Sequence, residues 1–187
     1  MQRSNFLNSM IDKYKKEIVP KLKEEFNLIN DLSLPFLEKI VLNMGLAESL
    51  TNKDALEKAM EHLAAISGQK PKFTKAKKSI SSFKLREGDK IGAMVTLRGQ
   101  KAWHFLEKLI AIVSPRIRDF RGVDDSKFDK LGNYSFGIAE QIIFPEINYA
   151  QVDKIRGMVI TLVFKNSNPE KSKKLLELLG LPFKKNN

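Results

Sequence analysis

Seven basic residues crowded between Gly68 and Gly88 are the strongest chemical signal in this sequence. No acidic residue occurs between Glu61 and Glu87, so nothing along this stretch offsets their charge. Ammonium and guanidinium groups in such a run neutralise phosphates, and lysine acts there as a mobile point charge. The alternative is a solvated charge run on the surface. We favour contact with a nucleic-acid backbone, made by Lys70, Lys72, Lys75, Lys77, Lys78, Lys84 and Arg86.

Apolar residues interrupt this stretch, residues 68–88, which we call the basic arm. Phe73, Ile80 and Phe83 either pack the base of the arm onto the domain or touch ribose and base surfaces. We favour packing. A connection of this length within a compact domain is usually functional or disordered.

Residues that can carry catalysis are scarce. His62 and His104 each fall inside a predicted helix, where a histidine is more often structural than a general base. The chain has no cysteine, which excludes disulfides, thiolate zinc sites and cysteine nucleophiles. The phosphate loop of P-loop enzymes and the dinucleotide-binding glycine pattern are also absent. We therefore expect no enzyme activity and no cofactor; an RNA-modifying enzyme, or its RNA-binding accessory subunit, is the alternative.

The segment 116–136 mixes charges of both signs with aromatic residues. Arg116, Arg118 and Arg121 suit phosphate contacts, but the aspartates around them suit a protein partner at least as well. These aspartates are Asp119, Asp124, Asp125 and Asp129. The last three are weak candidates for Mg²⁺, although aspartates in a loop more often form turns. The aromatic residues, Tyr134 among them, can anchor the loop.

Length and composition bound the remaining possibilities. The 187 residues suit a single RNA-binding domain over 1–187, and 42% hydrophobic residues suffice for a buried core. A net charge of +11 attracts polyanions. No apolar run approaches the roughly 20 residues of a membrane span, and the N-terminus lacks a signal-peptide core. We expect a cytoplasmic protein; a membrane-surface protein would need an amphipathic helix with fewer acidic residues.

Periodic apolar residues predict helices and strands in alternation. A helix over 6–27 buries a stripe from Ile11 to Phe26 and is bent or divided at Pro20. Further helices begin near Thr51 and end at Gly68, span 100–113, and run from Pro169 to Gly180. Alternating side chains predict strands over 39–44, 91–98, 138–143 and 158–164.

This order of elements is typical of an α+β fold. We expect a mainly antiparallel, open, ferredoxin-like sheet with helices on one face, plus the basic arm as a long loop. In the strand over 91–98, Thr96 and Arg98 belong to the outward row. Because that row is small, polar or basic, helices need not cover it, and it can receive an RNA helix.

Eight motifs stand in an order that closely resembles one family. They are 39–45 (KIVLNMG), 67–71 (SGQKP), 74–79 (TKAKKS), 83–88 (FKLREG), 95–99 (VTLRG), 115–122 (PRIRDFRG), 132–135 (GNYS) and 140–146 (EQIIFPE). The resemblance is to the family of the bacterial large-subunit ribosomal protein numbered five, which holds 5S ribosomal RNA. It runs from about Lys13 to Phe183. Several long motifs in one order are specific, whereas any one alone is not.

The resemblance implies a structural protein in the central protuberance of the large ribosomal subunit. The implied partners are 5S rRNA, 23S rRNA, P-site transfer RNA, the small-subunit ribosomal protein numbered thirteen and other central-protuberance proteins. The implied rRNA-binding residues are Lys39, Asn43, Lys70, Thr96 and Arg98. The residues implied to face transfer RNA are Lys72, Lys75, Lys77, Lys78, Ser79 and Lys84. Those implied at the bridge to the small subunit are Arg116, Arg118, Arg121 and Tyr134.

Overall fold

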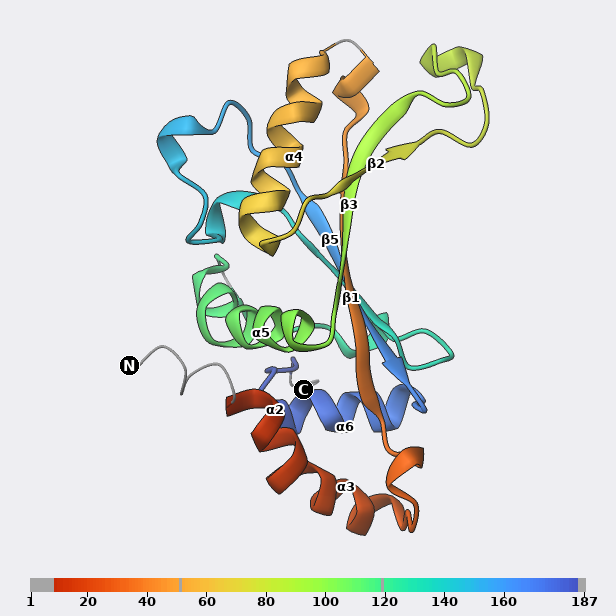
Figure 1. Ribbon diagram of the computed structural model, residues 1–187, viewed down its shortest axis with the longest axis vertical. Coiled ribbons are helices and arrows are strands. Elements are labelled where there is room, and N and C mark those ends of the chain that lie inside the picture. The colour runs from red at the N-terminus through yellow and green to blue at the C-terminus, as the bar shows by residue number, and fades with distance from the viewer. Residues whose placement is uncertain (1–8, 51, 119, 185–187) are drawn as a thin grey trace. The chain divides into compact units, whose positions relative to one another are not determined.

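A computed structural model describes residues 9–50, 52–118 and 120–184 (Figure 1). The chain divides into two compact units. Unit 1 comprises Met1–Ile40, Leu97–Phe136 and Thr161–Asn187, and unit 2 comprises Val41–Thr96 and Gly137–Ile160. The boundaries fall within strands, so each unit carries part of the sheet. The single domain over residues 1–187 stays a prediction.

Five strands form an antiparallel open sheet in the order β2-β3-β1-β5-β4. They are β1 (Phe36–Gly45), β2 (Lys72–Lys75), β3 (Lys90–Arg98), β4 (Tyr134–Ile138) and β5 (Met158–Lys165). Alternate side chains are buried, for example Ile40, Leu42 and Met44 in β1, because successive residues of a strand point to opposite faces. The predicted α+β fold with an open antiparallel sheet is confirmed.

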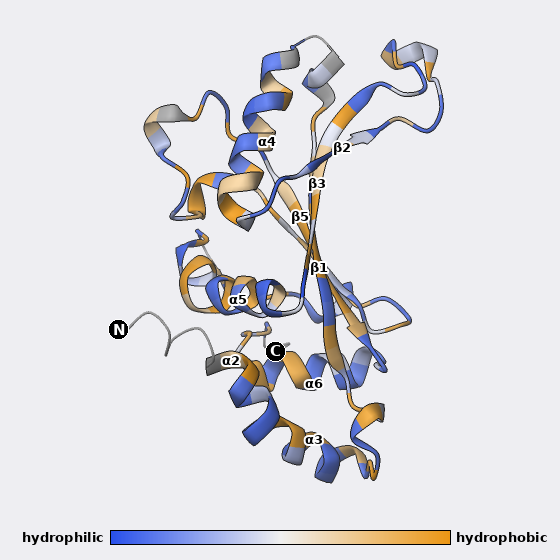
Figure 2. Cartoon of the chain, in the orientation of Figure 1, coloured by the Kyte–Doolittle hydropathy of each residue, from blue (hydrophilic) through white to orange (hydrophobic). Residues whose placement is uncertain are grey.

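The α-helices of the described residues are α2 (Ser9–Lys13), α3 (Val19–Phe26), α4 (Lys53–Ser67), α5 (Gln100–Lys108) and α6 (Pro169–Leu179). The longer helices, α3 to α6, are amphipathic and bury one face each. Figure 2 shows hydrophobic and hydrophilic bands along them. In the described part of the chain, no helix is long and apolar enough to cross a membrane.

The predicted N-terminal helix is divided, as its proline suggested. A π-helical turn, Tyr14–Ile18, separates α2 from α3, which has Pro20 in its first turn. Proline lacks the N–H that an α-helix needs and clashes with the carbonyl four residues earlier, so the wider turn accommodates it. Residues 6–8 of the predicted helix lie outside the described residues.

The ends of α4 combine one predicted and one unpredicted cap. Thr51 lies outside the described residues, and the N-cap is Asn52, whose side chain accepts hydrogen bonds from the backbone N of Asp54 and Ala55. Gly68 ends the helix as predicted, with a left-handed φ of 61° that glycine adopts without strain.

The predicted strand over 138–143 is wrong. The strand lies earlier, in β4, where buried Tyr134, Phe136 and Ile138 alternate with Ser135 and Gly137. Residues Gln141–Ile143 form a 3-10 helix instead. The backbone of Gln141 bonds to a loop residue, since its N donates to the O of Arg156 at 3.1 Å.

Candidate nucleic-acid interface

The basic arm is a β-hairpin whose end curls into a short turn, all within unit 2 (Figure 1). β2 pairs antiparallel with β3, with one irregularity between Thr74 and Lys75. Beyond β2, the N of Ala76 donates to the O of Asp89 at 2.8 Å, and the N of Gly88 donates to the O of Ala76 at 3.0 Å. The backbone pairing therefore continues past the regular strands and fixes the direction of the arm.

The tip of the arm is closed by its own hydrogen bonds. Ile80 and Leu85 exchange backbone bonds of 2.9 and 3.1 Å around a 3-10 turn, Ser81–Phe83. The hydroxyl of Ser79 accepts a bond from the N of Glu87 at 2.9 Å. The side chains predicted to meet phosphates lie on an ordered backbone rather than on a structureless loop.

Every cationic side chain of the arm is exposed. The exposed residues predicted to contact nucleic acid are Lys70, Lys72, Lys75, Lys77, Lys78, Lys84 and Arg86, and Ser79 is exposed as well. Within the described residues, no carboxylate forms an ion pair with a lysine of the arm. The positive charge is thus left for an external anion.

The apolar residues of the arm divide into a packed one and two exposed ones. Phe73 is half-buried, and the Nζ of Lys90 lies 4.1 Å from the centre of its ring. Ile80 is 43% exposed and Phe83 70% exposed. The predicted packing is therefore wrong for Ile80 and Phe83, because the narrow tip offers no apolar surface to cover them.

The outer face of the sheet within unit 2 mixes polar and apolar side chains, among them Val159 of β5, which is 45% exposed. Asn43 of β1 is exposed and Thr96 of β3 is half-buried, while their neighbours Leu42, Met44 and Val95 are buried. Gln69 joins this face without having been predicted from the sequence, because its Nε2 donates to the O of Thr96 at 3.2 Å. Its position in the 67–71 motif could have identified Gln69 as a candidate from the sequence.

Two further predicted residues lie on strands within unit 1. Lys39 of β1 is half-buried, and its Nζ lies 3.4 Å from a carboxylate oxygen of Glu38. Arg98, the last residue of β3, is exposed. Both side chains therefore lie at strand positions that alternate with the buried residues of β1 and β3.

The arginine segment of unit 1 is exposed around a buried tyrosine. Arg116, Arg118 and Arg121 are exposed. Tyr134 is completely buried, and its hydroxyl donates to the O of Asp124 at 2.7 Å. Burial, and secondarily the charge of Asp124, raises the pKa of this phenol. The assignment of Tyr134 to the bridge surface is thus corrected: its side chain anchors the loop and does not reach a partner.

The aspartates of this segment form turns and an ion pair. Asp124 accepts hydrogen bonds from the backbone N and hydroxyl of Ser126, and these bonds hold the pKa of its carboxyl below its usual range. Asp129 accepts bonds from the backbone N of Leu131 and Asn133 at 2.9 and 2.7 Å. Asp125 pairs with Lys173 at 2.9 Å. The turn-forming interpretation is confirmed.

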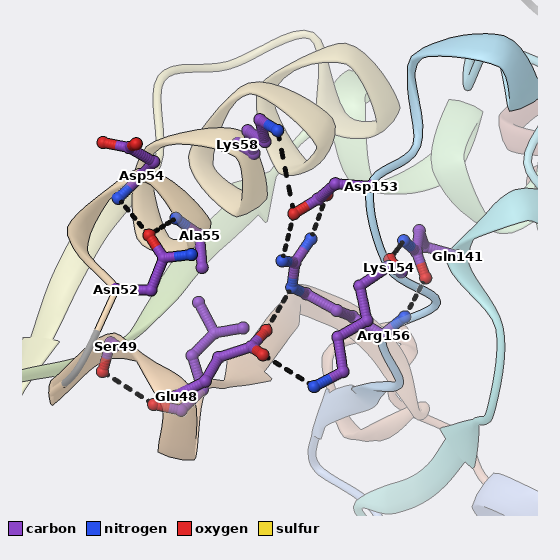
Figure 3. A network of polar contacts seen from close by, with 11 residues as sticks. Glu48, Ser49, Asn52, Asp54, Ala55, Lys58, Gln141, Asp153, Lys154 and Arg156 are labelled. Carbon is purple, nitrogen blue, oxygen red and sulfur yellow. Dashed lines mark hydrogen bonds and ion pairs between the residues drawn. The ribbon is translucent and has the colours of Figure 1, made fainter.

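A buried arginine organises a polar network in unit 2 that was not predicted from the sequence (Figure 3). Arg156 is 5% exposed. Its Nη1 and Nη2 donate to the two carboxylate oxygens of Asp153, both at 2.8 Å, and its Nε donates to Glu48 at 3.0 Å. Its backbone N donates to the side chain of the buried Gln141.

This network clamps the loop over residues 139–157. The Nε2 of Gln141 donates to the O of Lys154 at 2.8 Å, and the Nζ of Lys154 reaches Glu48 at 2.7 Å. The bonds from Arg156 hold the pKa of the Asp153 carboxyl well below its usual range. The clamped loop presents Tyr149 and Ile155 to solvent, at 73% and 50% exposure.

An ordered hairpin of lysines without a described carboxylate partner, together with exposed polar residues on the sheet face, is typical of a basic α+β protein that binds a polyanion. The family described as ribosomal protein L5 matches residues 30–86, and the family that describes the C-terminus of the same ribosomal protein matches residues 90–183. The large ribosomal subunit protein uL5 of Lactococcus lactis subsp. cremoris (strain MG1363) is 51% identical over 178 residues, which cover 95% of this chain and 99% of that protein. The proteins of the same name from Streptococcus sanguinis (strain SK36) and Streptococcus pneumoniae (strain Hungary19A-6) are 53% identical with the same coverage.

The chain belongs to the ribosomal protein L5 family. It is a structural ribosomal protein and not an enzyme, so the predicted family is confirmed and the alternative of an RNA-modifying enzyme is excluded.

Proposed function

We propose that this protein binds 5S rRNA through the outer face of its sheet and joins it to 23S rRNA in the central protuberance. In unit 2 the face offers Asn43 and Thr96, with Gln69 bonded to Thr96 and Lys70 beside it. In unit 1, Lys39 and Arg98 are proposed as rRNA contacts of that unit. Small polar side chains let a wide RNA minor groove approach, where 2′-hydroxyls and phosphates are recognised.

The basic arm reaches a second RNA, the P-site transfer RNA. Its contacts are the exposed side chains of Lys72, Lys75, Lys77, Lys78, Ser79 and Lys84. Paired backbone in the hairpin pre-organises these cations, which reduces the ordering cost of binding. Exposed Phe83 at the tip suits stacking on a base or packing on a ribose.

Protein contacts complete the proposed function. The exposed Arg116, Arg118 and Arg121 are the surface proposed for the small-subunit protein numbered thirteen. The clamped loop with exposed Tyr149 and Ile155 is a second candidate surface for that protein or for other central-protuberance proteins. Fixed, exposed aromatic and aliphatic residues are typical of protein interfaces.

One observation carries the proposal: unit 2 combines exposed Asn43 on its sheet face with a hairpin of lysines that no described carboxylate neutralises. A test of the face substitutes Asn43→Ala in the full chain. Loss of one polar contact in the interface weakens 5S rRNA binding by roughly fivefold to tenfold. The exposed Lys101→Ala serves as the control and leaves binding within about twofold, since it removes only a screened charge outside the proposed face. Unchanged binding by Asn43→Ala contradicts the assignment of this face.

A further inference from the structure

The turn between α3 and β1 in unit 1 displays large aliphatic side chains. Ile29 is 98% exposed and Leu32 is 81% exposed, and the neighbouring Phe36 is 41% exposed. Single apolar residues on a surface need no explanation, but a group of them on one ordered turn marks an interaction site.

The backbone of this turn is fixed by hydrogen bonds. Asn30 caps it: its Oδ1 accepts from the N of Leu32 at 2.9 Å, and its O accepts from the hydroxyl of Ser33 at 2.6 Å. The Nδ2 of Asn166, in the segment after β5, donates to the O of Leu32 at 2.6 Å. The backbone that carries the exposed side chains is therefore already ordered, which reduces the entropy cost of binding.

A hollow of about 500 Å³ lies beside Leu32. Its apolar walls are Tyr14, Val19, Leu32, Leu34 and Phe36. The floor is firm, because the ring of Tyr14 lies 5.8 Å from that of Phe36 and 5.2 Å from that of Trp103, and its hydroxyl donates to the O of Pro35 at 2.9 Å. Such a cavity accepts an aliphatic or aromatic side chain.

The charges at the mouth of the hollow are unbalanced. Asp31 is paired with Lys23. Lys15 and Lys165 also line the hollow and are exposed, and within the described residues neither has a carboxylate partner. The mouth therefore complements a negative group placed next to apolar side chains.

We propose that this surface, formed by Ile29, Leu32, Phe36, Lys15 and Lys165, docks a protein whose contacting segment carries aliphatic side chains beside a carboxylate. RNA fits it less well, because the two most exposed side chains, Ile29 and Leu32, are aliphatic and offer no ring on which bases stack, and the two lysines are few beside the cations of the arm. The site uses none of the residues proposed above for 5S rRNA, 23S rRNA, transfer RNA or the small subunit.

The test uses large ribosomal subunits purified from cells in which the tagged chain is the only copy of this protein. A photo-crosslinking amino acid replaces Ile29, and the crosslinked product is identified by peptide mass spectrometry. We expect a protein segment that contains Asp or Glu within a few residues of the crosslink. The same amino acid in place of Ile112, which is 44% exposed elsewhere in unit 1, is the control and does not capture that segment.

Second-site changes test the chemistry of the contact. Adding Leu32→Ser should lower the crosslink yield about tenfold, because the buried aliphatic contact is lost. Adding Lys15→Glu and Lys165→Glu should lower it about fivefold, whereas Lys15→Arg with Lys165→Arg retains it. Lys101→Glu with Lys130→Glu is the matched charge control and leaves the yield unchanged.

Three outcomes overturn the proposal: a crosslink to RNA, a crosslink to a second copy of this chain, or no crosslink. A protein crosslink that is insensitive to both Leu32→Ser and the charge reversals overturns it as well. Binding of the purified variants to 5S rRNA is measured in parallel. Retained 5S rRNA binding shows that a variant is folded. It also distinguishes failure of this docking site from failure of the proposed function.

Discussion

At the scale of single residues, Arg156 is the side chain at the centre of the polar network in unit 2. Its planar guanidinium forms a two-pronged contact with Asp153 and a third bond to Glu48. Planarity and five fixed donors suit arginine, and not lysine, to such a contact. Removing it leaves the carboxylates of Asp153 and Glu48 with fewer partners.

The substitution Arg156→Met should lower the free energy of unfolding by about 2–4 kcal/mol, because breaking a buried ion pair on one side leaves its partners uncompensated. The upper part of the usual range is not expected, since Asp153 and Glu48 side chains are each 27% exposed and water screens them. Equilibrium unfolding in urea measures the change. Lys154→Ala, which removes an exposed pair to Glu48, is the control and should cost less than about 1 kcal/mol. Equal effects of the two variants would contradict a special role for Arg156.

The same network predicts a dependence of stability on acid. The pKa of Asp153 is lowered, first by its hydrogen bonds from Arg156, and the pKa of Glu48 is lowered, first by its hydrogen bond from Lys154. A depressed folded-state pKa contributes stability that is present above the unfolded-state pKa of about 4 and is lost as the pH falls through the folded-state pKa. The urea midpoint should therefore fall below about pH 4, and fall less steeply in Arg156→Met. Parallel pH profiles for the two proteins would argue against the network as the cause.

At the residue scale, the sequence indicated which charges are exposed and unpaired in the arm, and it did not indicate which charges are paired elsewhere. The lysines of the arm were predicted because no acid stands near them in the sequence. Arg156 was missed because its partner Glu48 lies 108 positions away, and because its nearby partner Asp153 gives no sign in the sequence that the pair is buried. Tyr134 was misplaced for a related reason: an aromatic residue in a polar segment gives no sign of whether it points inward.

At the scale of elements, the C-terminal segment and the arginine segment of unit 1 hold each other. The N of Val123 donates to the O of Pro182 at 2.8 Å, and the N of Lys184 donates to the O of Val123 at 2.9 Å. Gly122 has a φ of +98°, and a Cβ at this position would stand 2.6 Å from the backbone C of Phe183. Only glycine allows both the conformation and the close approach.

The substitution Gly122→Ala should therefore lower the free energy of unfolding by about 1–3 kcal/mol and loosen the segment next to Arg121. Gly137→Ala is the matched control, because its added Cβ would meet no atom within 4 Å and its φ is not positive. Urea unfolding and amide hydrogen exchange at Val123 measure the two effects. If both variants are as stable as the parent protein, the close approach of Gly122 to Phe183 does not contribute to stability.

The arm is the element whose electrostatics are tested most simply. Replacing Lys75, Lys77 and Lys78 with Ala should reduce the slope of log affinity against log salt by roughly 2–3 for P-site transfer RNA, because each lysine releases about one counterion. Binding of 5S rRNA should be spared. Transfer-RNA binding to ribosomes carrying the variant, over a salt series, provides the measurement. Collapse of 5S rRNA binding instead would mean that the arm belongs to the anchoring site.

Elements were predictable wherever one face is buried. Alternation located β1, β3 and β5, glycine located the ends of α4 and α6, and Asn168 located the start of α6, whereas Asn52 as the N-cap of α4 was not predicted. The strand over 138–143 was misplaced because β4 is short and because Tyr134 and Phe136, which begin its alternation, were assigned to the segment 116–136. The pairing of the arm into a hairpin depends on contacts with β3, which periodicity within the arm cannot reveal.

At the scale of the whole molecule, a net charge of +11 attracts any nucleic acid, so charge alone does not make binding specific. Specificity has to come from the shape and polar groups of the sheet face, whose contacts are less sensitive to salt than phosphate contacts. Because the chain belongs to the ribosomal protein L5 family, the ribosome is where it selects one RNA among several. The proposed function therefore depends on recognition of 5S rRNA in preference to other RNAs.

The most direct test compares binding of the purified full-length protein to 5S rRNA and to an unrelated RNA duplex of equal length over a salt series. Both complexes should weaken as salt rises, because both release counterions. We predict that at moderate salt 5S rRNA is bound at least about tenfold more tightly than the duplex, a difference of about 1.4 kcal/mol. Equal affinities for the two RNAs at every salt concentration would contradict this prediction.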